Sequence, residues 1–137
     1  MSLELKKKIE IDLKKRNITP KSVFDVVKYS LNGIMSYAED GKSIVLYLAY
    51  LIFEIVMGIV FRISGLEWIL IICILGIILS VELLNTAIEA ACDAITKKYN
   101  PLIKIAKDCG SAATFVIFIV AIILNIIIFY PKIIALF

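Results

Sequence analysis

Three long apolar runs dominate the chain after its first forty or so residues. They cover about Ile44–Ile63, Trp68–Ile95 and Ala112–Tyr130. A hydrocarbon core of about 30 Å is crossed by a helix of roughly 20 apolar residues, and each run is close to or above that length. A Ser-Gly step follows the first run and an Asn-Pro step follows the second, and both are typical of turns. The pattern therefore predicts three membrane-spanning helices joined by turns.

The segment before these runs has a different pattern. Leu3–Arg16 is rich in lysine and carries apolar residues at four-residue steps, and Lys21–Tyr37 has a broad apolar side. Basic amphipathic helices of this kind lie among the headgroups of anionic membranes. We therefore predict N-terminal amphipathic surface helices, with anionic lipid headgroups as partners; the alternative for each is a solvated helical tail. Residues 1–20 form a basic extension and residues 21–137 the membrane domain in this interpretation.

Composition agrees with an all-α integral membrane protein. The chain is 61% hydrophobic, against about 45–50% in soluble domains. Met1–Gly41 does not open with a short basic patch followed by an apolar stretch, as a signal peptide does, so no cleavage is expected. The chain has no histidine, which excludes Ser-His-Asp catalysis and imidazole-based zinc sites. The three cysteines have no metal-ligand spacing and are expected to be reduced thiols. We expect no nucleic-acid partner.

The positive charges are distributed very unevenly around the predicted spans. Nine of the fifteen Lys and Arg residues precede Ile44, and four lie in the predicted loop Lys97–Gly110. The other side of the spans holds only Arg62 and Lys132. Loops rich in Lys and Arg stay in the cytoplasm. We therefore expect the N-terminus and the Lys97–Gly110 loop to be cytoplasmic and the C-terminus to lie outside.

One face of the second span carries the polar side chains that bear on function. Glu82, Asn85, Glu89 and Asp93 fall within about 80° of one another on a helix with 100° per residue. The run Trp68–Ile95 would be about 42 Å long at 1.5 Å per residue, which exceeds the hydrocarbon core. Its cytoplasmic end therefore tilts or projects from the membrane, and the polar stripe lies on that end.

An acidic stripe at membrane depth needs a compensating partner, because an unpaired carboxylate there costs several kcal/mol. A Mg²⁺ ion is one answer, since it prefers carboxylate and phosphate oxygens. A polar contact that assembles helices is the other. Lys104, Lys107 and Asp108 follow in the next segment. Lysines beside a carboxylate stripe suit a magnesium-bound polyphosphate and phosphoryl transfer, although lysines in such a loop can also act as a topology signal alone.

The motif in this region is similar to that of a known family. ELLNTAIE spans Glu82–Glu89, Asp93 follows, and AKDCGSAA spans Ala106–Ala113. This spacing resembles the prokaryotic diacylglycerol kinase family, which includes undecaprenol kinases, and the likeness covers roughly Val23–Tyr130. FRISGLEWIL, at Phe61–Leu70, looks like the shorter undecaprenol-type branch.

The resemblance implies a homotrimer with three membrane helices and a surface helix in each subunit, and composite active sites near the cytoplasmic face. It implies ATP as co-substrate and Mg²⁺ as cofactor. It assigns the general base to Glu82 and a metal ligand to Glu89, and it places Ser111 with Glu82 at the lipid substrate. The residues implied in nucleotide binding are Asn85, Glu89, Asp93, Lys107 and Asp108.

The chain departs from the family pattern near the predicted metal site and in the first span. The family has a second metal-binding glutamate eight residues after a glycine matching Gly33, and here that position is Gly41. Asp40 is the preferred substitute and Glu39 the alternative. Glu54 in the first span matches no family residue, and its simplest role is as a partner for a polar group on a neighbouring helix or for water.

The function predicted from these observations is ATP- and Mg²⁺-dependent phosphorylation of a membrane lipid alcohol at the cytoplasmic face of a prokaryotic plasma membrane. The acceptor is diacylglycerol or undecaprenol, and the sequence leaves that choice open. The alternative is a non-catalytic helical oligomer or an ion-conducting bundle, in which the acidic stripe only assembles helices. That alternative does not explain the spacing of Lys107 and Asp108.

Overall fold

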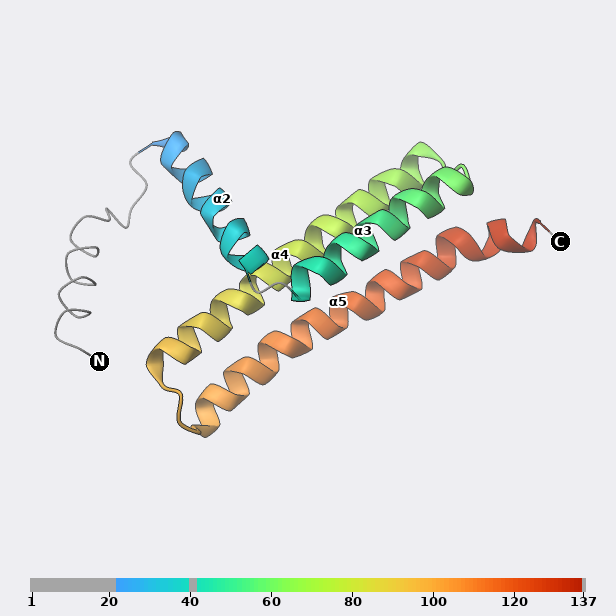
Figure 1. Cartoon of the computed structure of the whole chain (residues 1–137). Helices are drawn as coiled ribbons and strands as arrows, with labels where there is room; N and C mark the ends of the chain where they lie inside the picture. The colour runs from blue at the N-terminus through green and yellow to red at the C-terminus, as the bar shows by residue number, and fades with distance from the viewer. Residues whose placement is uncertain (1–21, 40–41, 137) are drawn as a thin grey trace. The chain divides into compact units, whose positions relative to one another are not determined.

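The computed structural model describes residues 22–39 and 42–136, apart from the side chains of Glu39 and Lys42. This part of the chain contains helices and no strand, which confirms the all-α prediction. The predicted surface helix at Leu3–Arg16 lies outside the described residues. The helices, shown in Figure 1, are α2 (Val23–Glu39), α3 (Lys42–Val60), α4 (Gly65–Ile95) and α5 (Pro101–Ile134).

Three of these helices are long and apolar enough to cross a bilayer. They contain the spans Ser43–Val60, Gly65–Ile95 and Pro101–Ile134, with mean hydropathies of 2.3, 2.4 and 3.0. The three predicted spans are therefore confirmed. Large apolar side chains on all three helices remain exposed in the single chain, as expected for surfaces that meet lipid or other helices.

The boundary of the last helix corrects one expectation. The segment from Pro101 to Gly110 was expected to be part of a cytoplasmic loop, but it forms the first turns of α5. Asn100 caps this helix, because its side-chain Oδ1 accepts a hydrogen bond from the backbone N–H of Leu102 at 2.9 Å. Proline at the first helical position has a suitable φ and lacks only an N–H that would be unsatisfied anyway. The α4–α5 connection is therefore a short turn, and the lysines that follow it are held on a helix.

The α3–α4 turn is fixed by a reciprocal cap. Ser64 Oγ accepts from the N–H of Glu67 at 3.3 Å, and Glu67 Oε2 accepts from the N–H of Ser64 at 2.6 Å. Arg62 enters the turn at a φ of 48°, in the left-handed region that non-glycine residues seldom adopt. Glu67 also pairs with Lys132 near the end of α5, with Oε1 3.1 Å from Nζ. All three spans are thereby connected at this end of the bundle.

Antiparallel packing of α4 against α5 forms the main helix interface. Figure 1 shows the two helices side by side, joined by the turn at one end. One buried cluster joins α4 and α5 to the residues that follow α3, and its buried members are Ile63, Ile71, Leu75, Ile128 and Phe129. A second cluster lies between α4 and α5, and its buried members are Ile74, Ile78 and Ala121. On α3, Gly58 lies against the indole of Trp68, so that an added Cβ would be 2.5 Å from a ring carbon. This contact brings α3 and α4 close together.

Glu54 is fully buried in the middle of α3, with 0% of its surface exposed. Its Oε1 accepts a hydrogen bond from Nδ2 of Asn125 on α5 at 2.7 Å. The same amide nitrogen lies 2.8 Å from the Tyr50 hydroxyl oxygen. A buried polar side chain must find such partners, because leaving it unsatisfied costs free energy. Glu54 therefore has the role that the sequence favoured, a polar partner on a neighbouring helix.

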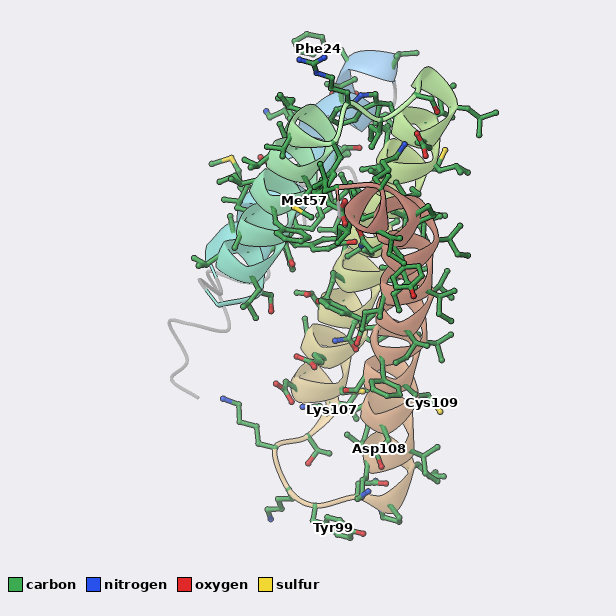
Figure 2. All side chains as sticks on the ribbon, turned by 90° about the vertical axis from the view of Figure 1, so that its right-hand side faces the viewer. Phe24, Met57, Tyr99, Lys107, Asp108 and Cys109 are labelled. Carbon is green, nitrogen blue, oxygen red and sulfur yellow. The ribbon has the colours of Figure 1, made fainter. Side chains whose placement is uncertain are left out.

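The described chain divides into two compact units between Met35 and Ser36. The first contains most of α2, and the second contains its last turn with α3, α4 and α5. In α2, Ser22 starts the helix by accepting from the N–H of Asp25 at its side-chain Oγ, at 3.2 Å. Apolar side chains of α2 such as Phe24, labelled in Figure 2, and Leu31 are exposed. The predicted helix over this segment is confirmed.

Candidate active site

The polar stripe predicted on the second span forms one continuous helical surface on α4, because Glu82 to Asp93 all lie within Gly65–Ile95. Glu82 and Asn85 are partly buried, whereas Glu89 and Asp93 are exposed. The Asn85 amide Nδ2 lies 3.4 Å from Glu89 Oε1 and donates a long hydrogen bond to it. Glu82 and Glu89 are seven residues apart on α4 and therefore lie on the same face, two turns apart. The stripe presents two carboxylates with an amide between them.

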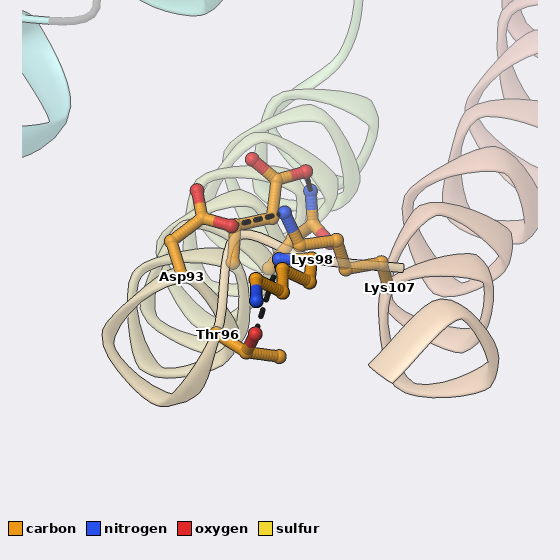
Figure 3. A network of polar contacts seen from close by, with 6 residues as sticks. Asp93, Thr96, Lys98 and Lys107 are labelled. Carbon is orange, nitrogen blue, oxygen red and sulfur yellow. Dashed lines mark hydrogen bonds and ion pairs between the residues drawn. The ribbon is translucent and has the colours of Figure 1, made fainter. Parts of the chain in front are cut away.

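Lys107 on α5 joins this stripe from across the helix interface. Its Nζ lies 2.5 Å from Asp93 Oδ1, and Figure 3 shows the lysine reaching from α5 to α4. The two side chains are 36% and 56% exposed, so the pair stabilises the fold by only about 0–1 kcal/mol. The contact matters more for position, because it holds an ammonium group at the edge of the carboxylate stripe.

The next residue, Asp108, does not join the Asp93–Lys107 pair. It forms an ion pair with Lys104 one turn earlier on the same helix. Ser111 is exposed on the following turn, and its carbonyl accepts a hydrogen bond from the Thr114 hydroxyl at 2.8 Å. Figure 2 shows Cys109 pointing away from the rest of the bundle, on a different side of α5 from Lys107. The structure thus brings together five of the predicted residues, namely Glu82, Asn85, Glu89, Asp93 and Lys107, and leaves Asp108 and Ser111 beside them on α5.

Gly110 is a site-region residue to which sequence reasoning gave no role. It is buried in the helix interface, and a Cβ added to it would be 2.3 Å from Asn85 Oδ1. That amide oxygen is itself buried and makes no hydrogen bond within the described part of the chain. The glycine was visible in the AKDCGSAA motif, but nothing in the sequence says which side chain it faces.

The predicted second metal ligand falls outside the structure. Asp40, the preferred substitute for the family's glutamate, lies outside the described residues, and so does the side chain of its alternative, Glu39. Glu89 is the predicted ligand that the structure describes. It lies on a regular stretch of α4 with Asn85 one turn before it.

The donor set on α4 suits a hard divalent cation. Glu82 and Glu89 offer carboxylate oxygen atoms, and Mg²⁺ prefers oxygen ligands. Among residues 22–39 and 42–136, no group of three acidic, histidine or cysteine side chains could enclose a metal ion. Mg²⁺ is commonly held by one or two carboxylates, with phosphates and water as its other ligands. The residues present therefore fit an ion that arrives with a polyphosphate, and they do not fit a closed structural metal site.

Comparison with known proteins decides the family. The model of the family described as "Prokaryotic diacylglycerol kinase" matches residues 28–129. The chain belongs to the prokaryotic diacylglycerol kinase family. The matched region contains all of α3 and α4 and most of α5, and with them every residue of the polar stripe.

Named relatives of this kinase cover most of its length. The undecaprenol kinase of Bacillus subtilis is 36% identical over 100 residues, which are 73% of this chain and 81% of the relative. The diacylglycerol kinase of Pseudomonas aeruginosa is 38% identical over 97 residues, or 70% and 78% of the two chains. That of Escherichia coli K12 is 34% identical over 88 residues, or 64% and 66%. The chain is therefore a membrane lipid kinase, and its family acts on diacylglycerol or undecaprenol.

Proposed function

We propose that this kinase transfers the γ-phosphate of ATP, with Mg²⁺, to the hydroxyl of diacylglycerol or undecaprenol at the cytoplasmic membrane surface. The observation that carries the proposal is the contact of Lys107 with Asp93 at the exposed end of a stripe that begins at the partly buried Glu82. Phosphoryl transfer needs cationic groups for the phosphates and a carboxylate for the acceptor's proton. The two ends of the stripe supply these two functions.

Glu82 is the proposed general base. It lies on the more buried part of the stripe, three turns before the end of a membrane-length helix. A lipid hydroxyl whose tails remain in the bilayer would reach this depth first. Glu82 takes the hydroxyl proton while the lipid oxygen forms a bond to the γ-phosphorus, and the bond from that phosphorus to the ADP oxygen breaks. The products are the lipid phosphate and ADP.

The exposed end of the stripe is the proposed nucleotide site. Lys107 and Asp93 are solvent-accessible, so the lysine can exchange its carboxylate partner for a phosphate oxygen. Glu89 is the proposed metal ligand, and Asn85 orients it through their hydrogen bond. When bound, Mg²⁺ would neutralise charge on the β- and γ-phosphates. Asp40 or Glu39 is proposed as the additional acidic ligand, and Asp108 as a further nucleotide contact.

A homotrimer with shared sites and a cytoplasmic N-terminus are part of the proposal. Thirteen of the fifteen Lys and Arg residues lie before Ile44 or between Lys97 and Lys107, which supports this orientation by the positive-inside rule. The described part of one chain lacks a three-acid metal cluster, which is compatible with a site completed by another copy. We also propose that anionic lipid headgroups bind the basic segments and that Ser111 contacts the lipid substrate.

The test is a phosphoryl-transfer assay on the purified chain in lipid micelles. γ-Labelled ATP and Mg²⁺ are supplied with diacylglycerol in one sample and undecaprenol in the other. Label is expected in phosphatidic acid, in undecaprenyl phosphate, or in both, and is expected to disappear when the divalent ion is chelated. Label that forms equally well after chelation would contradict the magnesium dependence. Lack of label in both lipids would contradict the proposed reaction.

A further inference from the structure

The two ends of the Asn85 amide contact different partners, and only one of these partners is another residue of the candidate site. Its Nδ2 donates to Glu89 on the same helix. Its Oδ1 lies against the surface of α5, where Gly110 leaves just enough room: an ideal Cβ at that position would be 2.3 Å from Oδ1 and 3.4 Å from Cγ. A Cβ atom essentially never lies within 3.0 Å of another heavy atom, so a residue with a Cβ at 110 would displace the end of the Asn85 side chain. The Asn85 amide therefore occupies the space that any larger residue at 110 would need.

The contact is specific to this amide. The third neighbour of the added Cβ is Ile88 Cδ1 at 3.8 Å, an ordinary van der Waals distance. With the Asn85 side chain removed, an alanine at 110 would meet no close atom. Gly76 of α4 differs, because a Cβ there would meet nothing within 4 Å. Gly110 is thus fitted to one side chain of the site, whereas Gly76 is not.

We propose that Gly110 is a positioning residue of the kinase, which sets the Asn85 amide and, through it, the Glu89 carboxylate that binds the metal–nucleotide. The inference rests on the proposed role of Glu89 and Asn85. Because Oδ1 is buried against α5, a substituent at 110 displaces the amide and with it the Nδ2 that donates to Glu89 Oε1. Their hydrogen bond is already long at 3.4 Å, so a small displacement breaks it.

A purely structural role would have a different signature. Small residues allow membrane helices to approach closely, and a larger residue at 110 could simply separate α4 from α5. That change would lower the stability of the bundle whatever side chain stands at 85. A positioning role instead requires that the effect on metal–nucleotide binding depends on Asn85. The two roles are separated by a double-mutant cycle, which measures the coupling between neighbouring side chains.

The experiment compares wild type, Gly110→Ala, Asn85→Ala and the double variant in lipid micelles. Binding of Mn²⁺ with a non-hydrolysable ATP analogue is followed by electron paramagnetic resonance, so that inactive variants can still be measured. Gly110→Ala is expected to weaken binding about tenfold, a change of about 1.4 kcal/mol. In the Asn85→Ala background the same substitution is expected to change binding less than twofold. Gly76→Ala is the matched control and is expected to bind as wild type does.

Several outcomes would overturn the inference. Unchanged binding in Gly110→Ala, an equal loss in Gly76→Ala, or a full tenfold further loss in the Asn85→Ala background would each contradict it. If Gly110→Ala does not assemble, the double variant is compared with Asn85→Ala, and failure of the double variant to assemble also contradicts it. Lipid phosphorylation by the wild type is measured in parallel. If the wild type does not phosphorylate lipid, the proposed function is refuted. If the wild type is active but the effects of Gly110→Ala and Asn85→Ala on binding are independent, only the role of Gly110 is refuted.

Discussion

The ammonium group of Lys107 on α5 lies 2.5 Å from Oδ1 of Asp93 on α4, which is fourteen residues earlier in the chain. The short turn between the helices allows this contact. The helices run antiparallel, so residues before the turn on α4 face residues after the turn on α5. The pair is exposed and adds little stability. Its importance lies in placing one cation near Glu89, at the exposed end of the polar stripe.

Replacing Lys107 with methionine should impair transfer more than it impairs folding. Methionine keeps most of the apolar stem and removes the charge, so the phosphates lose one cationic contact in the transition state. We expect kcat/KM for ATP to fall about 100-fold, the scale of losing one electrostatic stabiliser. Steady-state kinetics in micelles measures this. Lys97→Met, at an exposed position in the connecting turn, is the control, and an equal loss in both variants would contradict a specific role for Lys107.

Glu82→Gln should separate chemistry from nucleotide binding. Glutamine fills nearly the same space but cannot accept the hydroxyl proton, and a positioned general base is worth about 10²–10⁴-fold in rate. We expect kcat to fall at least 100-fold, with MgATP affinity within about threefold of wild type, since Glu82 lies at the opposite end of the stripe from Lys107. Ser80→Ala is the control, because the Ser80 hydroxyl only donates to the Gly76 carbonyl of its own helix. A variant that loses nucleotide affinity but keeps a normal kcat would refute the assignment of Glu82 as the base.

Glu54 should prove structural. Glu54→Gln keeps an oxygen for the Asn125 amide, so its stability should stay close to that of wild type. Glu54→Leu removes one of three acceptors of the Asn125 amide nitrogen, which keeps the Tyr50 hydroxyl and the Ala121 carbonyl, and should cost about 0.5–1.5 kcal/mol. Denaturant titration in micelles measures both. In Glu54→Leu/Asn125→Leu both polar partners are gone, and much of the loss should be recovered; a double variant less stable than Glu54→Leu would argue against this pairing.

Gly58→Ala should loosen the α3–α4 hairpin. An added Cβ would meet the Trp68 ring at 2.5 Å, and overpacking of this kind costs about 1–3 kcal/mol. Thermal or denaturant unfolding in micelles reports the change. Gly76→Ala, where the same atom meets open space, should not destabilise the protein and serves as the control. Equal behaviour of the two variants would mean that the contact with Trp68 does not limit the packing.

The orientation of the chain can be tested with reporter fusions. A reporter active only in the cytoplasm, fused after the C-terminal residue, should be inactive, and one inserted between Lys97 and Lys98 in the connecting turn should be active. The physical reason is the concentration of Lys and Arg before α3 and around that turn. The reverse result would contradict the proposed cytoplasmic face and the route by which ATP reaches the site.

Much of the fold could be predicted from local pattern. Three apolar runs of bilayer length predict three spans, because lipid leaves a backbone few alternatives to a helix. The stripe from Glu82 to Asp93 follows directly from helical periodicity on one element. The first turns of α5 were not predicted, because the hydropathy of the polar segment with Lys104 and Lys107 resembles that of a loop. Its helical start depends on the cap supplied by Asn100 and Pro101.

The sequence by itself determined the element types, the single face that carries the acids, and the family motif, because each of these depends on residues close together in the chain. The tertiary structure decided what meets across the helices. Periodicity on α4 and α5 separately does not set their relative rotation or register, and these place Lys107 on Asp93, Gly110 on Asn85 and Asn125 on Glu54. Side-chain packing in the whole bundle determines that rotation, so partners far apart in sequence become visible only when the helices are docked.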